Sequence, residues 1–339
     1  MKYLRREILR PHLLYFWASL SLFQKKYFDL IFKNQTSIPK HLAYLCPLCL
    51  KNFLVELEEE RKQSSEFTLD HFPPESVGGK LKILTCKKCN NEAGAYYESE
   101  LINKMNYEAT LSNIDNAKIP AKFSLIGIPG NFTCYIKKNN KDKLDVNFPI
   151  KSKNQSPFLN YWLENKSNNT SWEGKMTIQR PNDEKVVKAL LKTAYLICFA
   201  NFGYDFTFSS NGELIRAVLN NKEVYPCEFP LFWLNKKDLS LNFETHLGLR
   251  IIEKPINLQT FAVNIALNLN DNTSIACILI PFPGKDGWEK LKEINNFQKN
   301  KPQVAISFKK VVAVLPNNIF DGYTKAWNDF ILSKEIDII

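Results

Sequence analysis

The chain has 339 residues, and its 45 Lys and Arg against 35 Asp and Glu give a formal net charge of +10. Hydrophobic residues make up 45% and aromatic residues 13%, which excludes wholesale disorder, because disordered chains lack the apolar surface that offsets ordering entropy. The length leaves room for about two domains. The positive charge suits a polyanionic partner, either nucleic acid or an anionic membrane surface.

Residues 1–40 predict an N-terminal helical segment, because apolar residues recur at intervals of three to five. The apolar run Leu13–Phe23 ends at Gln24, so it is shorter than the ~20 residues that span a bilayer. It also lacks a small-residue cleavage site. We therefore expect no membrane partner and a cytoplasmic protein.

Residues 41–110 contain two C-x-x-C pairs. Cys46 and Cys49 form one C-x-x-C pair, and Cys86 and Cys89 form a second. Two such pairs supply the four thiolates of a tetrahedral structural Zn²⁺ site; a redox or disulfide role is the alternative. The remaining cysteines occur singly in apolar contexts and are expected to be buried core thiols: Cys134, Cys198, Cys227 and Cys277.

Between the two pairs lies Leu69-Asp70-His71-Phe72-Pro73, followed by Gly78-Gly79, and Asn90 directly follows the last cysteine. This combination resembles the zinc-knuckle HNH endonucleases, whose shared core is the ββα-metal fold. The resemblance covers about residues 44–105. We therefore expect residues 41–110 to form an HNH endonuclease domain with a four-cysteine zinc site.

The resemblance implies roles for three residues. His71 would be the general base that activates water, while Asp70 and Asn90 would hold a catalytic divalent ion, Mg²⁺ or Mn²⁺. Asn90 is expected to start a helix, with Asn91 as a second candidate ligand. The helical spacing of Ala93, Tyr97, Leu101 and Met105 predicts the core-facing side of this helix. Glu98 and Glu100 are expected on its solvated face, with an approach to the catalytic ion as the alternative.

One position departs from the family pattern. The residue that normally orients the general base, Asn or His, falls near Leu81, and no Asn or His lies between His71 and Asn90. A backbone carbonyl would then hold the imidazole, or catalysis is weak or lost.

Four lysines lie close to this motif: Lys80, Lys82, Lys87 and Lys88. No acidic residue occurs between Glu75 and Glu92. We expect these lysines to bind phosphates of the nucleic acid, since lysines beside a cleavage site neutralise its backbone. An ordinary charged hairpin surface is the alternative.

Residues 111–339 predict a mixed α+β domain of unknown role, in substrate selection or regulation. Strands are expected at 122–126, 132–137 and 144–148, then at 229–233, 261–269, 274–281 and 304–312. Asn182 or Asp183 caps a helix that ends at Gly203; another helix follows Asn211, and a third lies near 287–297. The fold class is therefore α+β throughout, with N-terminal helices, a ββα-metal module and a second α+β domain.

The function predicted from these features is metal-dependent hydrolysis of nucleic-acid phosphodiester bonds, with DNA as the substrate. By association, such a nuclease belongs to restriction, phage defence or mobile elements. A second hypothesis is a zinc-stabilised nucleic-acid-binding protein without catalysis. A third is a nuclease gated by a regulatory ligand or protein partner that residues 111–339 sense. The oligomeric state does not follow from the sequence.

Overall fold

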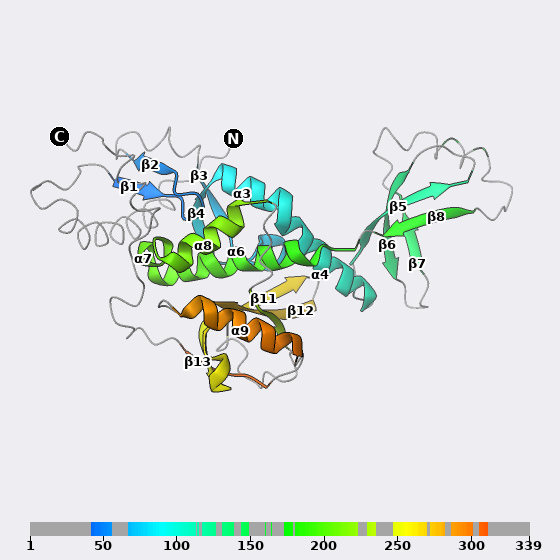
Figure 1. The fold of residues 1–339 in the computed structure, drawn as a ribbon. Coiled ribbons are helices and arrows are strands. Elements are labelled where there is room, and N and C mark those ends of the chain that lie inside the picture. The colour runs from blue at the N-terminus through cyan, green and yellow to red at the C-terminus, as the bar shows by residue number, and fades with distance from the viewer. Residues whose placement is uncertain are drawn as a thin grey trace, which may run out of the picture.

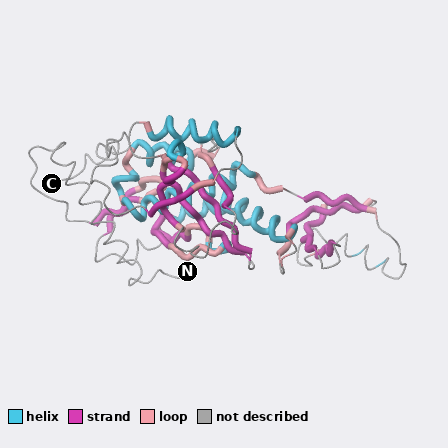
Figure 2. Tube along the Cα trace, turned by 90° about the horizontal axis from the view of Figure 1, so that it is seen from below, coloured by secondary structure: helices cyan, strands magenta, loops and turns pink. Residues whose placement is uncertain are grey.

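A computed structural model gives the arrangement of the chain (Figures 1 and 2). It describes residues 42–55, 67–112, 114, 117–126, 131–138, 144–148, 160, 164, 173–178, 180–222, 229–234, 247–269, 272–281, 286–300 and 305–310. The helical segment expected in residues 1–40 lies outside the described residues, as does Cys227.

The described part begins with two antiparallel hairpins. Strand β1 (Leu42–Leu45) pairs with β2 (Asn52–Val55), and β3 (Phe67–His71) pairs with β4 (Lys82–Cys86). A short 3-10 helix, η1 (Glu75–Val77), lies in the connection between β3 and β4. Helix α3 (Lys87–Ala93) follows β4 without a gap, so β3, β4 and α3 form the expected ββα unit.

Helical structure continues from α3 through a π-helical turn, η2 (Gly94–Glu98), into α4 (Ser99–Leu111). The four residues expected on the core-facing side are all buried: Ala93, Tyr97, Leu101 and Met105. The expected start at Asn90 is wrong by one turn. The helix begins at Lys87 because the Cys86 sulfur accepts a hydrogen bond from the Cys89 N–H and caps it.

A four-stranded antiparallel sheet follows α4 and stands away from the rest of the molecule (Figures 1 and 2). Its spatial order is β7-β6-β5-β8. The strands are β5 (Ile119–Leu125), β6 (Phe132–Lys138), β7 (Leu144–Asn147) and β8 (Gly174–Ile178). The first three match the predicted strands to within three residues, whereas β8 was not predicted.

Helix α6 (Asp183–Phe202) runs through the centre of the molecule (Figure 1). As predicted, the Asn182 side chain caps its start by accepting from the Lys185 N–H, and Gly203 ends it with a φ of 62°. Two shorter helices follow, α7 (Tyr204–Thr207) and α8 (Ser210–Asn220). Nearly every side chain of α6 from Val186 to Phe199 is buried, so neighbours enclose the helix on all sides.

A five-stranded antiparallel sheet, in the order β13-β10-β11-β12-β9, packs against α6. Its strands are β9 (Leu231–Leu234), β10 (Gly248–Lys254), β11 (Phe261–Leu269), β12 (Asn272–Ile280) and β13 (Ser307–Lys310). Helix α9 (Gly287–Asn300) lies along this sheet, and Gln298 donates to the Leu231 carbonyl. The 3-10 helix η5 (Ile256–Leu258) connects β10 to β11. Strand β10 was not predicted.

One hydrophobic core joins the N-terminal hairpins, the helices that follow them and the five-stranded sheet, whereas the four-stranded sheet has a small cluster of its own. The shared core contains Leu45, Ile83 and Leu101 from the N-terminal hairpins and helix, together with Leu196 of α6 and Ile278 of β12. The domain boundary expected near residue 110 stays a prediction, but the side chains of both sides pack together. The HNH-like segment is therefore built onto α6 rather than standing free of it.

Candidate active site and metal centre

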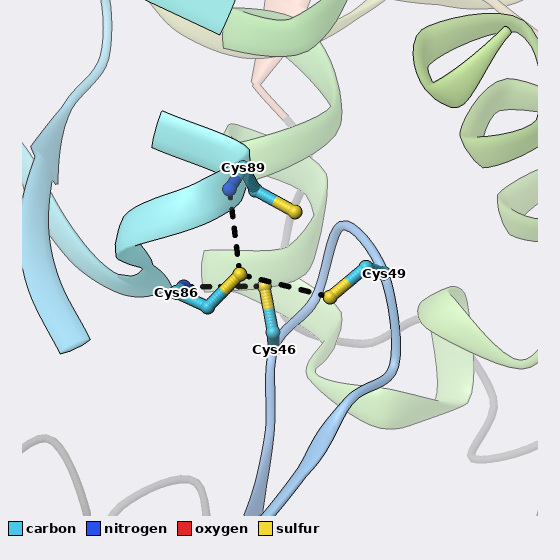
Figure 3. A group of neighbouring side chains, drawn as sticks. All are labelled: Cys46, Cys49, Cys86 and Cys89. Carbon is cyan, nitrogen blue, oxygen red and sulfur yellow. Dashed lines mark hydrogen bonds between the residues drawn. The ribbon is translucent and has the colours of Figure 1, made fainter. Parts of the chain in front are cut away.

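The four cysteines of the two C-x-x-C pairs converge at one point (Figure 3). Their sulfur atoms all lie within 4.8 Å of one another. Cys46 and Cys49 come from the turn between β1 and β2, while Cys86 ends β4 and Cys89 lies in α3. The two pairs, far apart in sequence, therefore form a single candidate metal centre.

Local geometry shapes each pair as a knuckle. In the first, the Cys46 N–H donates to the Lys51 carbonyl, and Leu50 takes the left-handed conformation with a φ of 59°. In the second, the Cys86 N–H donates to the Cys46 sulfur, which ties the two knuckles to each other at 3.4 Å. N–H groups that point at sulfur also favour the thiolate form.

The spacing fits zinc. Tetrahedral Zn–S bonds of about 2.3 Å place neighbouring sulfurs about 3.8 Å apart, and the Cys49 and Cys86 sulfurs are 3.7 Å apart. Burial raises the pKa of Cys46, and hydrogen bonding to Cys46 lowers the pKa of Cys86. Four thiolates at such distances repel one another, so a bound cation is needed to keep all of them ionised.

Helices from the later part of the chain hold the first knuckle. The Tyr204 hydroxyl donates to the Leu45 carbonyl at 2.8 Å and accepts from the Leu45 N–H at 3.0 Å. The Tyr195 hydroxyl donates to the Pro47 carbonyl at 2.7 Å, and the Asn220 amide donates to the Leu48 carbonyl at 2.8 Å. The metal centre therefore depends on contacts with α6, α7 and α8.

The predicted catalytic pair occupies the end of β3. Asp70 and His71 are consecutive in the strand, so their side chains point to opposite faces of the hairpin. Asp70 is 2% exposed. Its Oδ2 accepts from the Thr85 hydroxyl at 3.2 Å and lies 2.7 Å from the Lys192 Nζ. Asp70 therefore faces the protein interior and is already paired with a cation.

Lys192 of α6 bridges Asp70 to a second buried carboxylate. Its Nζ lies 2.7 Å from the Glu98 Oε1, and Lys192 itself is 1% exposed. Burial by itself would lower the pKa of Lys192, but the two carboxylates outweigh it and raise that pKa. Burial also raises the pKa of Glu98, an effect that Lys192 offsets only in part. We call Asp70, Glu98 and Lys192 the buried triad.

The buried triad corrects one expectation. Glu98 does not lie on a solvated helix face, because η2 shifts the helical phase and α6 packs against that turn. Glu100 is partly exposed, and its Oε2 accepts from the Asn182 N–H at 3.1 Å.

His71 lies on the accessible face of the hairpin. Its side chain is 20% exposed, and its Nε2 is 3.9 Å from the Glu75 Oε2. Lys82 is its cross-strand neighbour. Leu81, at the position where the family carries Asn or His, is 58% exposed. Within the described residues, no carbonyl is hydrogen-bonded to the imidazole, and Glu75 is the carboxylate within 4 Å of it.

The remaining predicted site residues are partly or fully exposed. Asn90 is partly exposed and stands one turn into α3, while Asn91 is exposed. The four lysines expected to bind phosphate are all exposed: Lys80, Lys82, Lys87 and Lys88. Their phosphate-binding role, like the roles of Asp70, His71 and Asn90, stays a prediction. The expected core thiols Cys134, Cys198 and Cys277 are buried.

Sequence reasoning missed Lys192. One signal was present: Lys188 and Lys192 stand one helical turn apart in the largely apolar middle of the helix. Charged residues in such a helix are almost never fully buried unless they are paired. This pattern predicts that each buried lysine has a polar partner but does not say which one.

Comparison with known proteins agrees with the motif. Residues 58–106 match the family model of HNH endonucleases, so the HNH assignment is confirmed for this segment. The match contains Asp70, His71, the second knuckle and Asn90; the first knuckle lies before it. No curated protein and no solved structure matches the chain.

Residues 58–106 are thus similar to the HNH endonucleases, and this match supports a nuclease at the level of the family. Such nucleases act on nucleic acid, and the four-cysteine group is able to hold a metal ion. Among the helices that the structure describes, none combines the length and apolar character that a bilayer crossing requires.

Proposed function

We propose that this protein is a metal-dependent endonuclease that hydrolyses phosphodiester bonds of DNA. One observation carries the proposal: Asp70-His71 ends the first strand of a hairpin that runs directly into a cysteine-anchored helix bearing Asn90, inside the segment matched by the HNH family. This arrangement supports hydrolysis because one ββα unit carries both a base and candidate oxygen ligands for a divalent cation.

His71 is the proposed general base. Its imidazole lies on the accessible face of the hairpin, where an attacking water and a phosphate have room to approach. The neutral ring takes a proton from that water, and the nearby Glu75 carboxylate stabilises the imidazolium that results. The exposed Lys80 and Lys82 neutralise phosphates on either side of the cleaved bond.

The chemistry of the donor set fits a divalent cation. The Asp70 carboxylate and the Asn90 carboxamide supply the oxygen ligands that Mg²⁺ and Mn²⁺ prefer. When bound, such an ion polarises the scissile phosphate and stabilises the leaving oxygen. In the described conformation, Lys192 occupies one Asp70 oxygen.

A second candidate is a zinc-stabilised protein that binds nucleic acid without cutting it. Two observations favour it. Leu81 replaces the residue that orients the base, and the Asp70 carboxylate is enclosed and paired with Lys192. A nuclease gated by a ligand or partner of residues 111–339 would agree with the observations behind both candidates. Helix α6 lies in that range and carries Lys192, which pairs with Asp70.

The test incubates wild type, His71→Ala and the exposed control Ser76→Ala with plasmid DNA, single-stranded DNA and RNA. Each reaction contains Mg²⁺, Mn²⁺ or EDTA. We expect wild type and Ser76→Ala to cut plasmid DNA in the presence of metal, and His71→Ala to bind without cutting. Binding by all three proteins with no cutting would reject the nuclease in favour of the binding protein.

A further inference from the structure

The buried triad holds an unusual balance of charge beside the proposed catalytic hairpin. Two carboxylates, Asp70 and Glu98, share the single ammonium of Lys192, each at 2.7 Å. All three side chains are at least nine-tenths buried. With both carboxylates ionised, the triad carries a net negative charge in a largely enclosed region.

Lys192 lies in a fully buried stretch of α6. The α6 side chains from Ala189 to Phe199 are all buried, so an ammonium that leaves Asp70 and Glu98 would remain desolvated. Removing one partner of a buried ion pair is strongly unfavourable for that reason. A divalent ion bound to Asp70 beside Lys192 would instead face a like charge at short range.

From this geometry we propose that Lys192 is the resident cation of the catalytic hairpin. From α6 it occupies the position beside Asp70 that the divalent ion of the proposed nuclease would take, and it competes with that ion. The proposal rests on the proposed function for the identity of the ion. It makes Lys192 a positioning residue, because it acts on the reaction through the availability of Asp70.

The chain offers a matched control. Lys188 lies one turn earlier on α6 and is also fully buried, but its Nζ donates to the Asn221 carbonyl and lies 5.9 Å from the ring centroids of Tyr96 and Tyr97. Lys188→Met and Lys192→Met therefore remove the same buried charge from the same helix. Only the second vacates the position beside Asp70.

The experiment measures Mn²⁺ binding to the zinc-loaded full chain by titration calorimetry, without nucleic acid. We expect Lys192→Met to bind Mn²⁺ at least tenfold more tightly than wild type, and the double variant with Asp70→Asn to lose that gain. Lys188→Met should stay within about twofold of wild type. Equal affinities in Lys192→Met and wild type would overturn the proposal, as would an equal gain in Lys188→Met.

If Lys192→Met does not fold, Mn²⁺ titrations of wild type and Asp70→Asn test the proposal instead. Low-micromolar Mn²⁺ binding by wild type that Asp70→Asn abolishes overturns the proposal, whereas indistinguishable titrations support it. The readout is separate from cleavage. A wild type that cuts DNA and binds Mn²⁺ tightly through Asp70 keeps the proposed function and rejects the role of Lys192. If wild type does not cut DNA but Lys192→Met binds Mn²⁺ more tightly than wild type, the role of Lys192 is kept and the proposed function is rejected.

Discussion

Tyr204 offers the clearest test of how the later helices stabilise the metal centre. It is fully buried in α7, and its hydroxyl is bonded to both the N–H and the carbonyl of Leu45, the residue before Cys46. Burial raises the pKa of Tyr204, which keeps the phenol protonated as a donor. Tyr204→Phe removes both bonds while preserving the ring.

The magnitude follows from the two backbone groups left without partners. Each buried polar group that loses its hydrogen bond costs about 1–3 kcal/mol, so Tyr204→Phe should lower the free energy of unfolding by about 2–6 kcal/mol. Zinc should also leave faster, because Cys46 is no longer held on its N-terminal side. Urea unfolding of the zinc-saturated protein measures the first effect, and zinc release to a chromogenic chelator measures the second.

Tyr96→Phe is the matched control, since its hydroxyl donates to the Lys222 carbonyl at an exposed position. Water replaces that bond, so we expect a loss below about 1 kcal/mol and unchanged zinc release. The reasoning fails if Tyr204→Phe destabilises the protein no more than Tyr96→Phe does.

Three further predictions concern the site. Cys86→Ser should lose stoichiometric zinc, measured by elemental analysis, while Cys134→Ser retains it; full zinc in both would reject the four-thiolate site. Replacing Lys87 and Lys88 together by Gln should reduce the slope of log binding constant against log salt by about two; an unchanged slope would make them ordinary surface lysines. The pKa of Glu98 is raised in the folded protein, so the unfolded chain loses the Glu98 proton at a lower pH than the folded protein does. The free energy of unfolding should therefore fall as the pH rises above about 4.3, the ordinary pKa of a glutamate. Glu98→Gln should lack this loss in pH-dependent unfolding; parallel curves for the two proteins would contradict it.

Much of the local structure was predictable from the sequence, because it depends on neighbours along the chain. The capped helix between Asn182 and Gly203, the strand Phe261–Leu269 and the helix beginning at Gly287 all lie where periodicity and capping residues place them. The two C-x-x-C pairs predicted a common metal centre, because each pair forms its own knuckle.

Two local details were not predictable. Helix α3 starts at Lys87 and not at the predicted Asn90, because the Cys86 sulfur caps the helix. The phase of the same helical stretch changes at η2, which turns Glu98 inward. Both depend on atoms that neither helical propensity nor hydrophobic periodicity describes.

The sequence by itself determined the chemistry that the chain offers: four thiols in two knuckles, an Asp-His pair at a strand end and an Asn on the following helix. Only the tertiary structure decided what those groups touch. Lys192 meets Glu98 across 94 residues, and Tyr204 meets Leu45 across 159. The physical reason is that a buried charge or backbone group must find a partner wherever packing brings one. The spacing of residues along the chain does not specify which partner each buried group finds.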